Sequence, residues 1–529
     1  MATIREVLVS AVQHHEAGQL QQAEQLYRLI LQQKSDYFPA LHGLGLIAYQ
    51  AGYIDEAIAH YRQAIALKPD SADAYNNLGL ALLANGEYAA AVASYQQAIA
   101  LNANYAEAYN NLGHALRHQG KVAEAIAAYD QAIGLKPEFV SPHWNRSLAL
   151  LLGGDLQQGF AEYEWRWRRE GKQLRPFPQP LWDGSDLAGR RILLYAEQGF
   201  GDTIQFIRYA TWVAERGGQV VVECQAPLVR LVQTVPGVQT VVPQGEALPA
   251  FEVQRPLMSL PWLHGTTLET VPATVPYLQV PNSSTASLNT PLGTQLKVGF
   301  VWSGNPENRN NRNRSCTTAD FRPLLDIPGV TLYSLQKAAQ PEELAQLGEV
   351  GYRLQDLSPQ LQDFGDTAAA IAQLDLVITV DTAVAHLAGA LGKPVWVLLS
   401  FAPDWRWMLE REDTPWYPTM RLFRQAEFGD WAGVFTRVVT ALQEALNGEV
   451  KNLVPPSIGG LGGPDGAALL KTAIQHHQAG RLAEAEALYQ QILEAQPDQA
   501  EVWQLRGALA AAEKRSPDAI AYYQQALAL

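Results

Sequence analysis

Three residues that could belong to an anion-binding site follow one apolar run in the second half of the chain. Asp381 and Thr382 come directly after DLVITV (375–380), and His386 follows in the helix-like stretch AVAHLAGAL. A helix beginning here would direct free N–H groups and about half a positive charge toward the preceding turn. His386 would lie one turn further along the same face. The pattern predicts a phosphate site, and a surface histidine is the alternative for His386 taken alone.

Asp202 follows another apolar run, RRILLYAEQ (190–198), and a glycine turn. If this run is a buried parallel strand, Asp202 stands at the carboxyl edge of the sheet, where α/β proteins bind ligands. A carboxylate in that place could act as a general base. An aspartate at a helix start is also a common N-cap, so these residues alone leave both interpretations open.

Other polar residues follow further apolar runs. Ser303 and Asn305 leave KVGFVWSG (297–304), and Lys337 ends VTLYSLQK (330–337). Lys337 could contact phosphate or acceptor, or could be an ordinary surface lysine. Asp366 in DFGDT either caps the next helix or contacts a nucleoside.

A dense aromatic group follows the last of these runs, KPVWVLLSF (393–401). Aromatic faces can stack on sugar rings, but residues this dense often only pack a loop that has no secondary structure. We favour packing, with one member facing a ligand. The group consists of Trp405, Arg406, Trp407, Trp416 and Tyr417.

Strands alternating with helices predict two consecutive Rossmann-like domains in the middle of the chain. The first spans residues 176–290 and the second 295–449, with the polar segment NSSTASLNTPLGTQ between them. Ligands would bind in a cleft between the two domains.

Both ends of the chain carry a repeat of 34 residues. In residues 1–171 this period separates Gly18, Gly52, Gly86, Gly120 and Gly154, and also Tyr27, Tyr61, Tyr95, Tyr129 and Tyr163. The glycines fall where a first helix ends, in the left-handed position that a short turn needs. The repeat resembles the tetratricopeptide repeat (TPR), so we expect an α-solenoid. The fifth repeat, which contains Trp165 and Trp167, is degenerate; we interpret it as a capping helix, with an aromatic ligand cluster as the alternative.

The period returns after a Gly/Pro-rich linker at 450–466. AIQHHQAGRLAEAEALYQQIL in residues 467–529 is close to the opening AVQHHEAGQLQQAEQLYRLIL. A second, partial TPR array is therefore expected. Because solenoid repeats need neighbours to bury their faces, we expect either a longer natural chain or self-association through these repeats.

Three asparagines, Asn77, Asn111 and Asn145, occupy one position in three successive repeats. Amide side chains both donate and accept hydrogen bonds, so a row of them could hold an extended peptide by its backbone. The row resembles the asparagine ladder of the eukaryotic O-GlcNAc transferase repeats. Ordinary TPR solvation is the alternative.

The composition excludes several classes of function. With 39 Lys and Arg against 53 Asp and Glu, the net charge of −14 opposes binding to nucleic acid or to an anionic membrane. No segment reads as a membrane span or as a signal peptide. Two cysteines, Cys224 and Cys316, provide no disulfide framework, so a cytoplasmic protein is expected.

The middle of the chain resembles a known family. EQGFGDTIQFIRY, WSGNPENRNNRNRS, YSLQK and DLVITVDTAVAHLAGALGKPVWVLL look like bacterial proteins that join TPRs to a domain related to family-9 glycosyltransferases, the heptosyltransferases. The resemblance implies the GT-B fold. It also implies an inverting transfer of sugar from a nucleotide-diphosphate sugar, without a metal or other cofactor.

The resemblance also implies roles for single residues. Asp202 would be the general base, and Asp381, Thr382 and His386 would bind the nucleotide diphosphate. Ser303 and Asn305 would belong to a second phosphate loop. Arg312 and Arg314 stand where the family carries a lysine, and we favour Arg314; a solvated loop is the alternative for both.

These inferences together predict a glycosyltransferase whose TPR array selects an acceptor, a polypeptide in our interpretation. The alternative is a TPR scaffold whose transferase-like domain binds a nucleotide without catalysis. The intact GD and DTxxxH motifs favour the enzyme, and the missing lysine leaves the scaffold open.

Overall fold

The computed structural model describes residues 3–284, 286–307, 311–337, 341–347, 353–447, 453–454, 470, 473–474, 476–477, 481–495, 499–512 and 515–528. Contacts divide the chain into two compact units. The first contains Met1–Pro176 with Ala402–Leu409, and the second contains Phe177–Phe401 with Glu410–Leu529.

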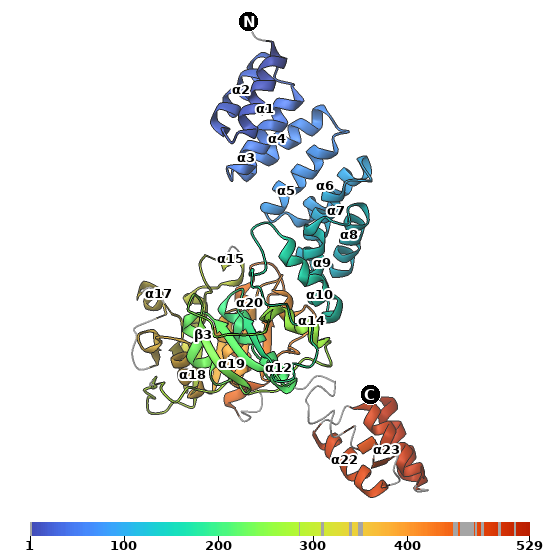
Figure 1. Cartoon of the computed structure of the whole chain (residues 1–529), viewed down its shortest axis with the longest axis vertical. Coiled ribbons are helices and arrows are strands. Elements are labelled where there is room, and N and C mark those ends of the chain that lie inside the picture. The colour runs from blue at the N-terminus through green and yellow to red at the C-terminus, as the bar shows by residue number, and fades with distance from the viewer. Residues whose placement is uncertain are drawn as a thin grey trace. The chain divides into compact units, whose positions relative to one another are not determined.

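The first unit is a solenoid of paired helices (Figure 1). Its helices are α1 (Ile4–Glu16), α2 (Leu20–Gln33), α3 (Phe38–Gln50), α4 (Ile54–Leu67), α5 (Ala72–Ala84), α6 (Tyr88–Leu101), α7 (Ala106–His118), α8 (Val122–Leu135), α9 (Val140–Leu152) and α10 (Leu156–Tyr163).

The repeated residues explain this pairing. The five turn glycines that are 34 residues apart have φ between +73° and +90°, the left-handed conformation predicted for them. Within a pair, small residues bring the helices close: a Cβ on Gly79 would lie 2.5 Å from the ring of Tyr95. Tyr95 and Tyr129 are fully buried in these gaps.

The first sheet of the second unit has four parallel strands in the order β3-β2-β1-β4. The strands are β1 (Arg191–Tyr195), β2 (Gln219–Cys224), β3 (Val238–Pro243) and β4 (Val253–Pro256), and the helices are α11 (Phe200–Phe206), α12 (Tyr209–Glu215), α13 (Val229–Val232) and α14 (Leu260–His264). The sequence pattern predicts one helix over 202–216. The structure has two, α11 and α12, with buried Arg208 at the break between them.

The second sheet has six parallel strands in the order β10-β9-β8-β5-β6-β7. The strands are β5 (Leu296–Val301), β6 (Val330–Ser334), β7 (Leu354–Asp356), β8 (Leu376–Val380), β9 (Val395–Leu399) and β10 (Met420–Arg424). The helices are α15 (Asn311–Arg314), α16 (Arg322–Leu325), α17 (Pro341–Ala345), α18 (Phe364–Ala372), α19 (Ala383–Ala390) and α20 (Trp431–Leu446). A continuous apolar core that includes Phe300, Ile378 and Trp396 packs around it.

The strand orders locate where a ligand would bind. In the second sheet the chain runs outward from β5 through β6 to β7, then returns to place β8 on the other side of β5. The first sheet reverses in the same way at β1, between β2 and β4. Open α/β sheets bind ligands outside the carboxyl ends of the strands at such reversals. The residues after β1, β5 and β8 are therefore the candidates for chemistry.

The C-terminal repeats are again helical: α22 (Leu482–Ala495), α23 (Ala500–Ala512) and α24 (Ser516–Ala528). Tyr489 is fully buried, whereas Tyr523, one repeat later, is 37% exposed. The prediction of a TPR solenoid, two Rossmann-like parallel sheets and further TPRs is thus confirmed. Apart from 453–454, the predicted linker 450–466 lies outside the described residues, and the exact domain boundaries and self-association stay predictions.

Candidate active site

Asp202 lies in the first turn of α11, directly after β1. The helix begins at Phe200 with Gly199 as its N-cap, so Asp202 is the third helical residue and not the first. Its Oδ2 accepts a hydrogen bond from the amide N of Gly199 at 2.8 Å. The capping interpretation is therefore correct in part, because the carboxylate closes the turn. Asp202 is half-buried at the carboxyl edge of the first sheet, where a base for an incoming acceptor is expected.

The N-terminus of α19 follows β8 in the second sheet. Thr382 is its N-cap residue, and Asp381 precedes it. The Thr382 hydroxyl lies 3.0 Å from the Thr379 hydroxyl, which itself donates to the carbonyl of Val380. The Thr382 side chain accepts no hydrogen bond from the backbone N–H groups of the first turn of α19. The first N–H groups of a helix have no partner within it, so this end is suited to an anion.

The first turns of α11 and α19 are in direct contact. A Cβ built on Gly201 would lie 2.9 Å from Cδ2 of His386 and 3.6 Å from Cα of Ala383. His386 is only 4% exposed, and its Nδ1 lies 2.9 Å from the hydroxyl of Tyr417. The structure therefore brings together the two motifs that the sequence separates by nearly two hundred residues, GD at 201–202 and DTxxxH at 381–386.

The loop after β5 is held by its own polar side chains. The Ser303 amide donates to Oε1 of Gln336 at 3.1 Å, and its hydroxyl accepts from Nδ2 of Asn311 at 3.2 Å. The guanidinium of Arg314 packs against Gly304 in this loop. Arg314 and the Ser303 loop are thus neighbours, and phosphate binding by them stays a prediction.

The other predicted phosphate ligands are Asn305, Lys337 and Arg312. Asn305 is exposed, and its side chain accepts from the amide of Glu307 at 3.0 Å. Lys337 is also exposed and donates to the carbonyl of Gln362 at 2.7 Å. The backbone of Arg312 is helical in α15, but its side chain lies outside the described part of the structure.

Asp366 does not cap α18, contrary to our expectation. The N-cap is Asp363, because the helix begins at Phe364, three residues before a helix capped by Asp366 would begin. The Asp363 carboxylate accepts from the amide of Asp366 at 3.0 Å. Both carboxylates face Arg230 of the first sheet's α13, at 2.9 Å for Asp363 and 3.4 Å for Asp366. These ion pairs join the two sheet domains beside the α11–α19 contact.

The aromatic group divides between the two compact units. Trp405 and Arg406 lie in the short 3₁₀ helix η6 (Trp405–Trp407), which clusters with the solenoid. There Trp405 packs edge-on against Phe160 with a centroid distance of 5.6 Å, and Arg406 bonds to Asp404 at 2.8 Å. Trp416 belongs to the second unit and is fully buried. The packing interpretation accounts for all three, and a role facing a donor stays a prediction.

Sequence reasoning missed the buried cation beneath the α11–α19 contact. Arg208 is 4% exposed, and its guanidinium lies 4.5 Å from the ring centroids of both Tyr277 and Tyr417. An arginine directly after an apolar helix was the available signal. Tyr277 follows a segment without regular structure, and no local pattern marks it.

In the solenoid, the three ladder asparagines form a hydrogen-bonded chain with two buried neighbours, Asn76 and Asn110. Asn145 donates to Asn110 at 2.9 Å, and Asn110 to Asn111 at 3.2 Å. Asn111 donates to Asn76 at 3.0 Å, and Asn76 to Asn77 at 3.3 Å. An amide has two donor hydrogens and two acceptor positions, so each ladder side chain keeps hydrogen-bonding capacity for a peptide while its orientation is fixed.

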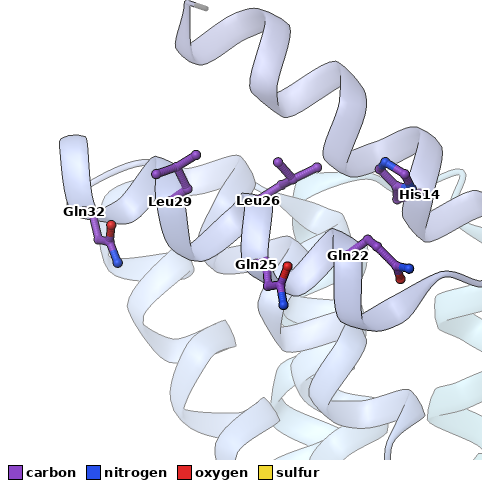
Figure 2. Close-up of a pocket in the computed structure, with 6 residues that line it drawn as sticks. All are labelled: His14, Gln22, Gln25, Leu26, Leu29 and Gln32. Atoms are coloured by element: carbon purple, nitrogen blue, oxygen red, sulfur yellow. The ribbon is translucent and has the colours of Figure 1, made fainter.

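A hollow of about 450 Å³ lies elsewhere in the solenoid, between α1 and α2 (Figure 2). It is lined by His14, Gln22, Gln25, Leu26, Leu29 and Gln32. These residues do not overlap with those predicted for chemistry. Within the described ranges, no three His, Cys, Asp or Glu side chains gather as metal ligands. Of the described helices, none has both the length and the apolar character needed to cross a membrane.

Family models match the repeats at both ends of the chain and one segment of the second sheet domain. A TPR repeat model matches residues 45–86, and a tetratricopeptide repeat model matches 80–138, 110–170 and 470–529. The model of Glycosyltransferase family 9 (heptosyltransferase) matches residues 329–403. That segment runs from β6 to just past β9 and includes Lys337, Asp366, Asp381, Thr382 and His386. Asp202 and the Ser303 loop lie outside it.

One curated relative is Protein FlbA of Caulobacter vibrioides, which is 30% identical over 295 residues. The match covers 50% of this chain, and the chain spans about half (48%) of the relative's length. Among solved structures, MamA is 29% identical, with 29% of this chain and 91% of that chain covered and a TM-score of 0.28. The TPR protein YrrB is 19% identical, with 31% and 84% covered and a TM-score of 0.28.

The strand reversals in the two sheets bring the GD and DTxxxH motifs together. The family-9 match lies in the second sheet domain, which carries DTxxxH. The chain therefore combines tetratricopeptide repeats with a segment, residues 329–403, that is similar to family-9 (heptosyltransferase) glycosyltransferases.

Proposed function

We propose that this protein is an inverting, metal-independent glycosyltransferase of the GT-B type. It would move a sugar from a nucleotide-diphosphate sugar to an acceptor selected by the TPR array. The observation that carries the proposal is the contact between the N-terminal turns of α11 and α19, with Gly201 against His386. It brings the turn that carries a carboxylate against a helix end that is suited to an anion, at the strand reversals of two parallel sheets.

The proposed reaction assigns a role to each side of this contact. The Asp202 carboxylate takes the proton of the acceptor as the acceptor atom bonds to the anomeric carbon. The bond from that carbon to the diphosphate oxygen breaks, and its electron pair leaves with the diphosphate. Attack from the face opposite the leaving group inverts the anomeric centre.

The leaving diphosphate gains charge that the protein must stabilise. We assign this to the N–H groups of the first turn of α19, with Thr382 and His386, and to Arg314 beside the Ser303 loop. A helix N-terminus contributes about half a positive charge. One well-placed donor typically contributes about 3–4 kcal/mol to a transition state. These groups could support departure without a metal ion.

The TPR array supports a polypeptide acceptor. Asn77, Asn111 and Asn145 are held in a fixed row with spare donors and acceptors, which suits an extended backbone of any sequence. The solenoid also carries the 402–409 segment, which leaves the second sheet after β9. We infer that acceptor selection belongs to the array and the chemistry to the sheets.

A panel of nucleotide sugars tests the proposal. UDP-, GDP- and ADP-sugars are each added to the full chain, and the melting temperature and slow donor hydrolysis are measured. We expect one nucleotide class to raise the melting temperature and to be hydrolysed. A shift without hydrolysis or transfer would favour the non-catalytic scaffold, and no shift with any donor would contradict both nucleotide-binding interpretations.

Asp202→Asn tests the base once a donor is known. The amide oxygen can still accept from the Gly199 N–H, so the turn should persist. Transfer should fall by about 10²–10⁴-fold, the usual contribution of general base catalysis, with unchanged nucleotide affinity. Asp320→Asn is the matched control, because Asp320 bonds to the Thr317 amide at 2.8 Å in an equivalent turn outside the GD and DTxxxH motifs. Equal activity in both variants would remove Asp202 from this role.

A further inference from the structure

A buried chain of hydroxyl groups leads to His386 from the protein interior. Nδ1 of His386 lies 2.9 Å from the hydroxyl oxygen of Tyr417, which lies 3.4 Å from that of Tyr277. Tyr417 is fully buried and Tyr277 is 9% exposed. The opposite edge of the imidazole faces α11, because a Cβ on Gly201 would lie 2.9 Å from Cδ2 and 3.6 Å from Nε2.

The hydrogens of this chain can be assigned from its far end. Tyr277 donates its one hydroxyl hydrogen to the carbonyl of Ile204 at 3.0 Å and accepts from Nη2 of Arg208 at 2.9 Å. It has no hydrogen left for Tyr417. The Tyr417 hydroxyl must therefore donate, either to Tyr277 at 3.4 Å or to His386 at 2.9 Å. Hydroxyl hydrogen bonds are normally 2.5–3.0 Å long, so the histidine is the acceptor.

Arg208 holds this arrangement in place. Its guanidinium donates to three backbone carbonyls: Gln205 at 2.8 Å, Pro272 at 3.2 Å and Trp416 at 2.7 Å. It also lies 4.5 Å from the ring centroids of both tyrosines. These contacts come from the first sheet's helices, the connecting segment and the loop before β10. A fixed positive charge beside Tyr417 polarises its hydroxyl and strengthens it as a donor.

We propose that Tyr417 is a positioning residue that fixes the tautomer of His386. A hydrogen bond accepted at Nδ1 leaves the imidazole proton on Nε2. Nε2–H is then the edge presented toward the first turn of α11, where it donates to an oxygen of the nucleotide diphosphate. The ligand in this inference rests on the proposed function, whereas the tautomer does not.

Two amide substitutions separate the ring nitrogens. In His386→Gln the side-chain amide reaches the place of Nε2, and in His386→Asn it reaches only that of Nδ1. Binding of UDP, GDP and ADP to the full chain is measured by calorimetry. We expect the nucleotide affinity of His386→Gln to lie within about threefold to tenfold of the wild-type affinity, which is the range of one hydrogen bond. We expect His386→Asn to bind the nucleotide at least tenfold more weakly than His386→Gln. Equal or tighter binding by His386→Asn would overturn the proposal.

The tautomer is also measured without any nucleotide. The ¹⁵N shifts of His386 in the full chain, assigned by their loss in His386→Gln, should show the proton on Nε2. Tyr417→Phe should convert this pattern to a mixture of tautomers and weaken nucleotide binding about threefold to tenfold. The control is Tyr333→Phe, which removes another buried hydroxyl, bonded to the Asn289 carbonyl at 3.1 Å, and should change neither.

The ¹⁵N tautomer pattern and the nucleotide affinity test separate parts of the proposal. A wild-type pattern with the proton on Nδ1, or one unchanged in Tyr417→Phe, would overturn the tautomer assignment whatever the chain binds. If the tautomer is as proposed but UDP, GDP and ADP all fail to bind, the diphosphate part falls together with the proposed function.

Discussion

Gly201 is the residue on which the geometry of the candidate site depends most directly. Its missing side chain lets α11 touch α19, since a methyl group there would lie 2.9 Å from Cδ2 of His386. A flexible neighbour could move aside, but the His386 ring is held from behind by Tyr417. The close approach of the two helices therefore requires glycine at this position.

Gly201→Ala should separate the two helix ends. We expect a loss of stability of about 1–3 kcal/mol, the usual range for overpacking, and weaker binding of whichever nucleotide the panel identifies. Melting temperature and calorimetry measure both. Gly134→Ala is the control, because Gly134 is an exposed residue of α8 with nothing within 4 Å of an added Cβ. That change should be neutral or slightly stabilising, and a similarly mild effect at Gly201 would contradict the proposed contact.

Single residues were predicted from the sequence to different degrees. Asp202, Thr382 and His386 lie at the strand ends where the pattern and the resemblance put them. The prediction that Asp366 caps the next helix was wrong, because that helix starts at Phe364, three residues earlier than such a cap requires. Arg208 and Tyr277 were missed because their partners come from segments distant in sequence, and no local periodicity encodes such contacts.

At the scale of elements, repeated and strongly apolar segments were predictable and short or polar ones were not. The 34-residue period located the helix pairs of the first array and their turns. β3, β4, β7 and β10 were missed: β3 is only partly buried, and β7 has three residues. Their existence depends on pairing with a neighbouring strand, which the local sequence does not specify.

One element of the solenoid, α7, carries two histidines that should make the array sensitive to acid. Burial, with a smaller contribution from the nearby Arg117, lowers the pKa of His114 to about 4 and that of His118 to about 3. Their Nε2 atoms lie 3.3 Å apart, and the His118 ring stacks on Tyr88. The folded array therefore holds both imidazoles in their neutral form.

The sign of the pH effect follows from these lowered pKa values. Below about pH 6.5 His114 and His118 take up protons in the unfolded chain, whereas in the folded array they stay neutral until a much lower pH. The stabilisation is complete above that pH and is lost as the pH falls toward 4. His114→Leu should reduce this loss, and leucine fits because Leu80 and Leu148 occupy the same position in the adjacent repeats. Melting followed by circular dichroism at pH 7, 6 and 5 should show the variant gaining on the wild type; parallel curves would refute the assignment.

At the scale of the whole molecule, the residues proposed for recognition and those proposed for chemistry lie in different compact units. The ladder belongs to Met1–Pro176, whereas Asp202, Ser303 and the DTxxxH motif belong to the second unit. Stability contributions of sites that share no partners are usually additive. Changes in the ladder should therefore leave the folding and donor chemistry of the second unit intact, which makes the two proposed activities separable by mutation.

Replacing the ladder asparagines Asn77, Asn111 and Asn145 together by alanine should impair transfer to a polypeptide acceptor while donor hydrolysis continues at its normal rate. The physical reason is the loss of three fixed amides that would bond to the acceptor backbone, each contributing about 0.5–1.5 kcal/mol, so a drop in acceptor affinity of tenfold or more is expected. The control is a second triple alanine variant of asparagines outside the ladder: Asn85, Asn102 and Asn104. Transfer assays with saturating donor and varied acceptor measure the effect. Unchanged acceptor affinity in the ladder variant would show that the ladder asparagines serve only to hold α5, α7 and α9 together. A parallel loss of donor hydrolysis would show that the two units are not independent.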